Sequence, residues 1–95
     1  MSGTDPSGQP VKIPIEDVLD LHAFATSDIL SVVDEYLRAA FEAGFREVRL
    51  IHGRGAGVQR GSVQRFLATH PLVRQFWDAP ESHLGATLAR LGEKP

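Results

Sequence analysis

Hydrophobic and polar residues follow two different periods along the chain, and the changes of period mark the expected elements. Alternating or short continuous apolar runs, typical of β-strands, cover residues 18–22, 47–51, 72–77 and 86–91. Apolar residues three and four positions apart, typical of helices, cover residues 26–43 and 58–69. The chain therefore has the order β-α-β-α-β-β.

This order restricts the arrangement of the sheet. Crossover connections between parallel strands are right-handed in nearly all proteins, so two crossovers that step in the same direction place both helices on one face. The short turn before the last strand makes that strand antiparallel to its neighbour. We therefore expect an α/β fold: a two-layer β-α-β-α-β-β sandwich with a mixed four-stranded sheet, both helices on one face and the other face open.

The composition indicates one small globular domain. The chain has 95 residues, of which 42% are hydrophobic and 23% are charged, and it contains no cysteine. Disulfides and thiolate zinc sites are therefore excluded, and a cytoplasmic location is the default expectation. Residues 1–10 are polar and lack the apolar core of a secretory signal. We expect them to form a flexible tail ahead of a single domain over residues 11–95, with no membrane-spanning segment.

The charge is unevenly distributed. The net charge of −2 by itself argues against a nucleic-acid partner. Between residues 46 and 74, however, there is a single acid, Glu47, and six arginines: Arg46, Arg49, Arg54, Arg60, Arg65 and Arg74. If these side chains converge in the fold, they form a basic face for phosphate groups; otherwise they are scattered surface charges.

Two histidines close the first two expected strands. Ligands of open α/β sheets bind outside the carboxyl ends of the parallel strands, so we expect His22 and His52 to lie close together, with Asp20 beside His22. A pair of histidines can act as general base and general acid near neutral pH. Alternatively, the three side chains are ligands of a divalent metal such as magnesium or manganese, which would activate water.

The loop after His52 is rich in glycine and opens the second helix. Glycines allow close approach of the backbone, and the N–H groups at a helix N-terminus favour an anion. The loop matches neither the P-loop pattern, because no Lys-Ser or Lys-Thr follows Gly57, nor the dinucleotide-binding pattern, because Val58 stands where a glycine is needed. We therefore expect phosphate binding by Gly53, Arg54, Gly55, Gly57 and Arg60.

Two further residues have structural interpretations. His70 precedes Pro71, so we expect its charge to face the dipole at the C-terminus of the second helix. Trp77 is expected in the core or on the sheet surface, with base stacking as the less favoured alternative.

Three motifs in order resemble those of one family, the Smr (small MutS-related) domain. Leu19-Asp20-Leu21-His22 resembles its L-D-x-H signature, and residues 51–57 resemble its I-H-G-[KR]-G-x-G signature. Gly85-Ala86-Thr87 resembles the glycine-rich signature before the last strand. The resemblance covers residues 17–91 and implies a fold similar to the C-terminal domain of translation initiation factor 3. It also implies a stand-alone bacterial type of Smr protein.

The resemblance implies a function as well. Smr domains are associated with DNA nicking and, in some members, with RNA cleavage, so the resemblance implies that the chain is a nucleic-acid endonuclease, with Asp20, His22 and His52 as the expected catalytic residues. Two positions depart from the pattern: Ala23 replaces a glycine, and Ser82-His83 replaces a glycine pair. The alternatives are a non-catalytic DNA- or RNA-binding module that uses the same basic loop and helix, and a small protein-interaction domain.

Overall fold

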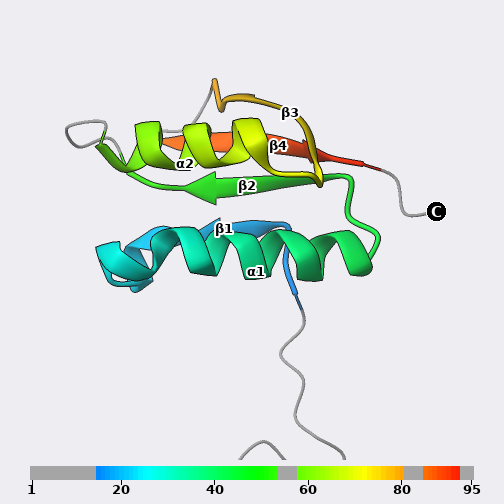
Figure 1. The fold of residues 1–95 in the computed structure, drawn as a ribbon, viewed down its shortest axis with the longest axis horizontal. Helices are drawn as coiled ribbons and strands as arrows, with labels where there is room; N and C mark the ends of the chain where they lie inside the picture. The colour runs from blue at the N-terminus through cyan, green and yellow to red at the C-terminus, as the bar shows by residue number, and fades with distance from the viewer. Residues whose placement is uncertain (1–14, 54–57, 81–84, 93–95) are drawn as a thin grey trace, which may run out of the picture.

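The computed structural model describes residues 15–53, 58–80 and 85–92 (Figure 1). The expected tail over residues 1–10 lies outside this part. The strands and helices are β1 (Val18–Asp20), α1 (Ile29–Glu42), β2 (Glu47–Ile51), α2 (Val58–Thr69), β3 (Val73–Asp78) and β4 (Ala86–Leu91). Two single 3-10 turns, η1 (Leu21–Ala23) and η2 (Thr26–Asp28), connect β1 to α1. In the described residues, no helix is long and apolar enough to span a membrane.

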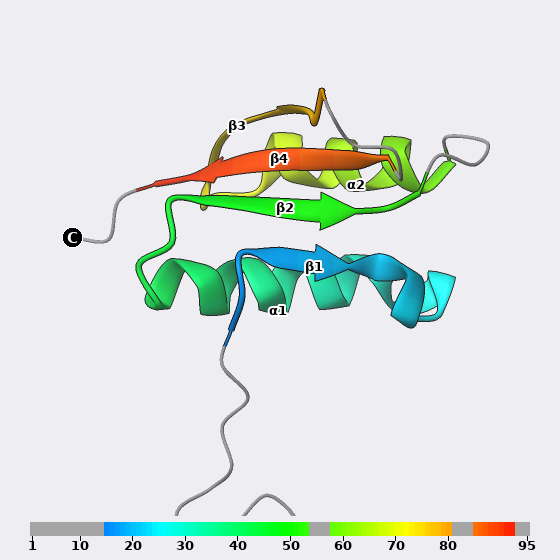
Figure 2. The ribbon, with the colours of Figure 1, turned by 180° about the vertical axis from the view of Figure 1, so that it is seen from behind.

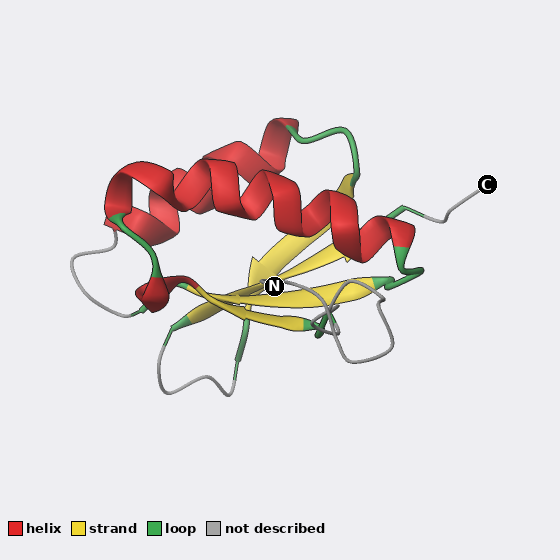
Figure 3. Cartoon of the chain, turned by 90° about the horizontal axis from the view of Figure 1, so that it is seen from below, coloured by secondary structure: helices red, strands yellow, loops and turns green. Residues whose placement is uncertain are grey.

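Both helices cover the same face of one four-stranded sheet, which confirms the predicted α/β sandwich (Figure 3). The strand order is β1-β2-β4-β3, with β1 parallel to β2 and with β4 antiparallel to both of its neighbours. The last strand therefore returns to the interior of the sheet and separates β2 from β3 (Figure 2). This insertion matters for the site, because it brings β4 directly beside the end of β2.

The strand register separates two faces of the sheet. One row of partners runs across all four strands on the helix side: Leu19, Leu50, Thr87 and Asp78. Side chains alternate along a strand, so the neighbouring row is on the open side: Val18, Arg49, Leu88 and Trp77. Trp77 therefore belongs to the sheet surface, where it is partly exposed.

The core lies between the sheet and the two helices. Each helix contributes an apolar stripe, and the fully buried side chains include Leu21, Val33, Leu37, Leu50, Val63 and Leu67. Burial of one such side chain contributes about 1.5–3 kcal/mol. This layer fixes the helices on the sheet and leaves the strand ends available for polar groups.

The structure corrects the predicted bounds of three elements, including the end of α1, which is Glu42 and not residue 43. β1 ends at Asp20 and not at His22, because the Asp20 carboxylate accepts the N–H of His22 at 2.9 Å and starts the η1 turn. α1 begins at Ile29 and not at Thr26, since the preceding turn is a 3-10 helix. β3 covers Val73–Asp78 and not residues 72–77.

His70 is buried after the end of α2 and is bonded to a side chain of α1, which differs from the expected interaction with the helix dipole. Its side chain is 2% exposed, and its Nε2 lies 2.8 Å from Oδ1 of Asp34 on α1. The Leu72 N–H donates to His70 Nδ1 at 3.1 Å, so the ring proton is on Nε2 and is donated to Asp34. This bond, together with that of Arg38, lowers the pKa of Asp34. His70 thus joins the two helices.

Candidate functional site

His22 stands on the η1 turn at the carboxyl end of β1, with its ring in contact with Asp20. Its Nδ1 lies 2.8 Å from Asp20 Oδ1, and the two side chains are 53% and 55% exposed. Because an ionised carboxylate only accepts hydrogen bonds, Nδ1 carries a proton and neutral His22 has an unprotonated Nε2. The His22 backbone N–H and then its ring lower the pKa of Asp20. Asp20 is therefore ionised and orients the imidazole.

Gly53, the first residue of the glycine-rich loop, lies against the other side of the His22 ring. Gly53 has φ +90, and a Cβ at this position would lie 2.7 Å from His22 Nε2. Glycine is thus required both by the backbone conformation and by the space that the ring occupies. The N–H groups of His52 and Gly53 both reach Gly85 O at 3.1 Å, which fixes this turn to the start of β4.

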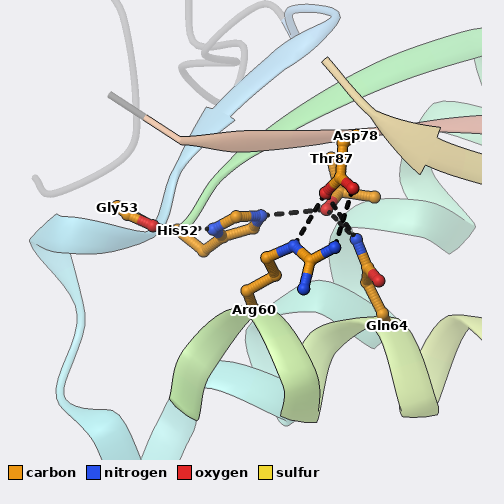
Figure 4. Close-up of polar contacts among 6 residues, drawn as sticks. All are labelled: His52, Gly53, Arg60, Gln64, Asp78 and Thr87. Atoms are coloured by element: carbon orange, nitrogen blue, oxygen red, sulfur yellow. Dashed lines mark hydrogen bonds and ion pairs between the residues drawn. The ribbon is translucent and has the colours of Figure 1, made fainter. Parts of the chain in front are cut away.

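His52 follows β2, but its surroundings differ from those of His22. The residue is only 4% exposed, and both ring nitrogens have partners: Nδ1 lies 3.0 Å from Gly53 O and Nε2 lies 2.9 Å from Thr87 Oγ1 (Figure 4). A carbonyl oxygen only accepts, so Nδ1–H donates to Gly53. Nε2 then accepts the Thr87 hydroxyl proton, and neutral His52 has no unoccupied ring nitrogen.

The hydrogen bonds continue from Thr87 to α2. Gln64 Nε2 donates to Thr87 Oγ1 at 2.9 Å and to Asp78 Oδ1 at 3.1 Å. Arg60, one turn earlier on α2, forms a two-pronged ion pair with Asp78, with both N···O distances 2.7 Å (Figure 4). Arg60 and then Gln64 lower the pKa of Asp78. Every buried side-chain nitrogen or oxygen in the described residues has a partner, so this network is fully satisfied.

The structure brings together only some of the predicted site residues. Gly53 lies against the His22 ring and its carbonyl accepts a hydrogen bond from His52, but the His52 ring is enclosed and Arg60 is paired with Asp78. The other predicted phosphate-binding residues, Arg54, Gly55 and Gly57, lie outside the described residues. Within the part of the chain that the structure describes, no three His, Asp or Glu side chains are grouped to hold a metal ion.

Sequence reasoning missed Thr87, Gln64 and Asp78. One signal was available: Arg60 and Gln64 are four residues apart and so lie on the same face of a helix. The other partners were not accessible to local patterns, because Thr87 is 35 residues from His52 and Asp78 is 18 residues from Arg60.

The fold and this corner define a class of protein: a two-layer α/β domain with an exposed Asp–His pair beside a glycine-rich strand-to-helix loop. The Smr domain profile matches residues 19–91, and the chain belongs to the Smr domain family. It is 39% identical over 75 residues to the endonuclease MutS2 of Caldicellulosiruptor saccharolyticus, a match that covers 77% of this chain. It is 40% identical over 62 residues to the endonuclease MutS2 of Helicobacter pylori, which covers 65% of this chain.

A solved structure supports the same family. The Smr domain of Thermus thermophilus MutS2 superposes with a TM-score of 0.73 at 31% identity, covering 79% of this chain and 96% of that domain. The two MutS2 endonucleases are much longer: the aligned region is 10% and 8% of their lengths. The similarity therefore concerns the Smr region of those proteins.

Proposed function

We propose that this Smr domain is a phosphodiester endonuclease, which nicks DNA or cleaves structured RNA, and that His22 is its catalytic base. One observation carries the proposal: Asp20 holds the His22 ring by Nδ1, and among the described residues Nε2 has no hydrogen-bond partner. A carboxylate that orients an imidazole in this way is the arrangement of many hydrolytic bases. The endonuclease relatives support nucleic acid as the substrate class.

In the proposed reaction, His22 Nε2 takes the proton of the attacking hydroxyl, which is water or, in RNA, a ribose 2′-hydroxyl. The hydroxyl oxygen bonds to phosphorus as the bond from phosphorus to the leaving oxygen breaks. The leaving oxygen then takes a proton from the imidazolium or from water. Asp20 stabilises the imidazolium through its hydrogen bond to Nδ1.

Phosphate binding is assigned to the glycine-rich loop and the start of α2: Gly53, Arg54, Gly55, Gly57 and Arg60. Asp78 engages Nε and Nη2 of Arg60, which leaves the Nη1 donors for a phosphate oxygen. His52 acts as a positioning residue, because its Nδ1–H holds the Gly53 carbonyl and thereby fixes Gly53 against His22. Magnesium and manganese enter the assay as variables, and no step is assigned to them.

The test is cleavage of supercoiled plasmid and of a structured RNA with magnesium, with manganese and with EDTA. We expect His22→Ala to lower the cleavage rate about 10²–10⁴-fold, the usual contribution of a general base. Asp20→Asn should lower it less, and Arg38→Ala, which changes an exposed residue on α1, should cleave like the wild type. Equal cleavage by wild type and His22→Ala would contradict the proposal.

The second candidate is a binding module without catalysis. It is favoured by the enclosure of His52, since the corner then has, among the residues that the structure describes, one exposed imidazole and no second ring to act as an acid. This candidate predicts salt-sensitive binding to nucleic acid that is weakened by Arg54→Ala, with no cleavage by any variant under any metal condition.

A further inference from the structure

A basic hollow lies at the end of the sheet opposite the histidines. It has a volume of about 430 Å³ and is lined by Arg46, Glu47, Arg74, Arg90, Leu91 and Gly92. Among the described residues, this lining contains three arginines and one glutamate, so it is basic. β2 begins here and ends beside the histidines, and the chain leaves β4 toward its C-terminus at this end (Figures 1 and 2).

Backbone pairing between the strands brings the three arginines of the hollow close together. Leu91 N–H donates to Arg46 O at 2.7 Å, and Arg90 is the register partner of Glu47, so the start of β2 and the end of β4 are held together. The pairing of β3 with β4 shifts between Val73 and Gln75, which places Arg74 at a bulge. A bulge changes the direction in which side chains point. Here the Arg74 side chain lies beside Gly92, since a Cβ on that glycine would be 3.2 Å from Arg74 Nε.

Two of the three arginines, Arg74 and Arg90, are at most weakly paired within the described residues. In the part of the chain that the structure describes, Arg74 forms no ion pair or hydrogen bond to a side chain. The Arg90–Glu47 pair has an N···O distance of 3.7 Å, and its side chains are 57% and 45% exposed, so it is a weak surface pair. Guanidinium groups gathered in this way favour an anion with several oxygens, such as a phosphate.

The open face of the sheet connects the hollow to His22. Four residue steps separate Glu47 from Ile51, which corresponds to about 13 Å at the rise of a strand. Midway along β2, Arg49 lies in the open-face row with Leu88 and Trp77, and all three are partly exposed. Arg49 and Trp77 thus lie between the hollow and the end of the sheet near His22. Unpaired nucleotides bind such a surface, since any base can stack on an aromatic face and a cation attracts the phosphate.

We propose that a single strand of nucleic acid lies across the open face of the sheet, with one phosphate in the hollow of Arg46, Arg74 and Arg90 and a base against Trp77. This inference rests on the proposed function, because the same strand reaches His22. Glu16 and Asp17, which line the neighbouring hollow with Glu47, repel phosphates. Their repulsion keeps the strand away from the start of β1, so that it crosses β3 and β4 before it reaches His22 at the carboxyl end of β1.

The experiment titrates the whole chain with 5′-fluorescein oligothymidylates of eight and of two nucleotides, at 50 and 200 mM salt, while recording anisotropy. Trp77 is the only tryptophan, so its fluorescence reports the open face directly. We expect the octamer to quench Trp77. The double variant Arg74→Ala/Arg90→Ala should bind the octamer about tenfold or more weakly, with a salt slope lower by about 0.7–1.4. The dinucleotide, which cannot span the face, should show little difference between variants.

The matched control is Arg38→Ala/Arg65→Ala, which removes the same charge from exposed positions on the two helices. It should bind nearly like the wild type, and Arg74→Lys/Arg90→Lys should restore most of the octamer affinity. Equal weakening by the two alanine pairs, or binding of the octamer without any change in Trp77 fluorescence, would overturn this inference and leave the proposed function standing. Failure of the wild type to bind the octamer, a duplex or a structured RNA would instead overturn the proposed function.

Discussion

His22 and His52 are equivalent in the sequence, since each follows a strand of the parallel pair, yet their surroundings are opposite. Within the described residues, the half-exposed side chain of His22 is held only through Nδ1, whereas His52 is buried and is bonded at both nitrogens. In neutral form both rings carry their proton on Nδ1. The difference is therefore in Nε2, which accepts the Thr87 hydroxyl in His52 and faces Gly53 in His22.

The position of each strand explains this difference. β1 is at an edge of the sheet, so its end is open on one side. β2 is interior, and β4 beside it brings Thr87 over the His52 ring. The comparison shows how the adjacent strand affects a histidine at a strand end. The imidazole is available for proton transfer when no strand covers it, and it has a structural role when an adjacent strand supplies a hydrogen-bond partner. The variants below test this division of roles.

The largest expected change in stability is that of His52→Ala. The substitution leaves a cavity and removes the partner of the Thr87 hydroxyl, so we expect the free energy of unfolding to fall by about 2–4 kcal/mol in urea denaturation. His22→Ala, on the exposed turn, should change it by less than about 0.5 kcal/mol. Similar losses in the free energy of unfolding for the two variants would contradict the structural role of His52 and the non-structural role of His22.

Thr87→Val tests the contact that separates the two rings. Valine has nearly the same shape but cannot donate to His52 Nε2 or accept from Gln64, so we expect a loss of about 1–3 kcal/mol. Thr69→Val is the control, because Thr69 is exposed and its hydroxyl bonds only to the backbone of its own helix. A loss no greater than that of the control would show that the network contributes little.

Gly53→Ala and Gly44→Ala separate backbone strain from contact with His22. The two glycines have φ +90 and φ +88, so each substitution should cost about 1–2 kcal/mol in the free energy of unfolding. A Cβ at Gly44 meets nothing within 4 Å, whereas one at Gly53 meets His22 Nε2. Only Gly53→Ala should therefore also reduce cleavage. Equal cleavage by the two variants would place the Gly53 contact outside the mechanism.

The smallest expected effect concerns pH. Asp78, like Asp20 and Asp34, has a pKa lowered by its native hydrogen bonds, so its contribution to stability is present above the ordinary aspartate pKa and is lost as the pH falls through the lower native value. Asp78→Asn should slightly lower the urea midpoint at pH 7 and leave it unchanged near pH 2. A larger decrease of the urea midpoint near pH 2 than at pH 7 would contradict this prediction.

The periodicity of the sequence predicts the elements well because that information is local. The bounds of β2, α2 and β4 follow directly from the pattern, and the ends of the two parallel strands predict a corner at His22 and His52, where the structure has Gly53 against His22. The burial of His52 depends on the insertion of β4 beside β2, which the local pattern does not contain. The same holds for His70, whose partner Asp34 is 36 residues away.

The most direct test of the two roles is a long-range ¹H–¹⁵N correlation of the imidazole nitrogens at a pH where both rings are neutral, with His22→Ala used for assignment. We expect His52 to be fixed with its proton on Nδ1 and with Nε2 accepting from Thr87, and we expect this pattern to change in Thr87→Val but not in His22→Ala. A His52 ring protonated on Nε2, or one that exchanges freely between tautomers in the wild type, would contradict the account.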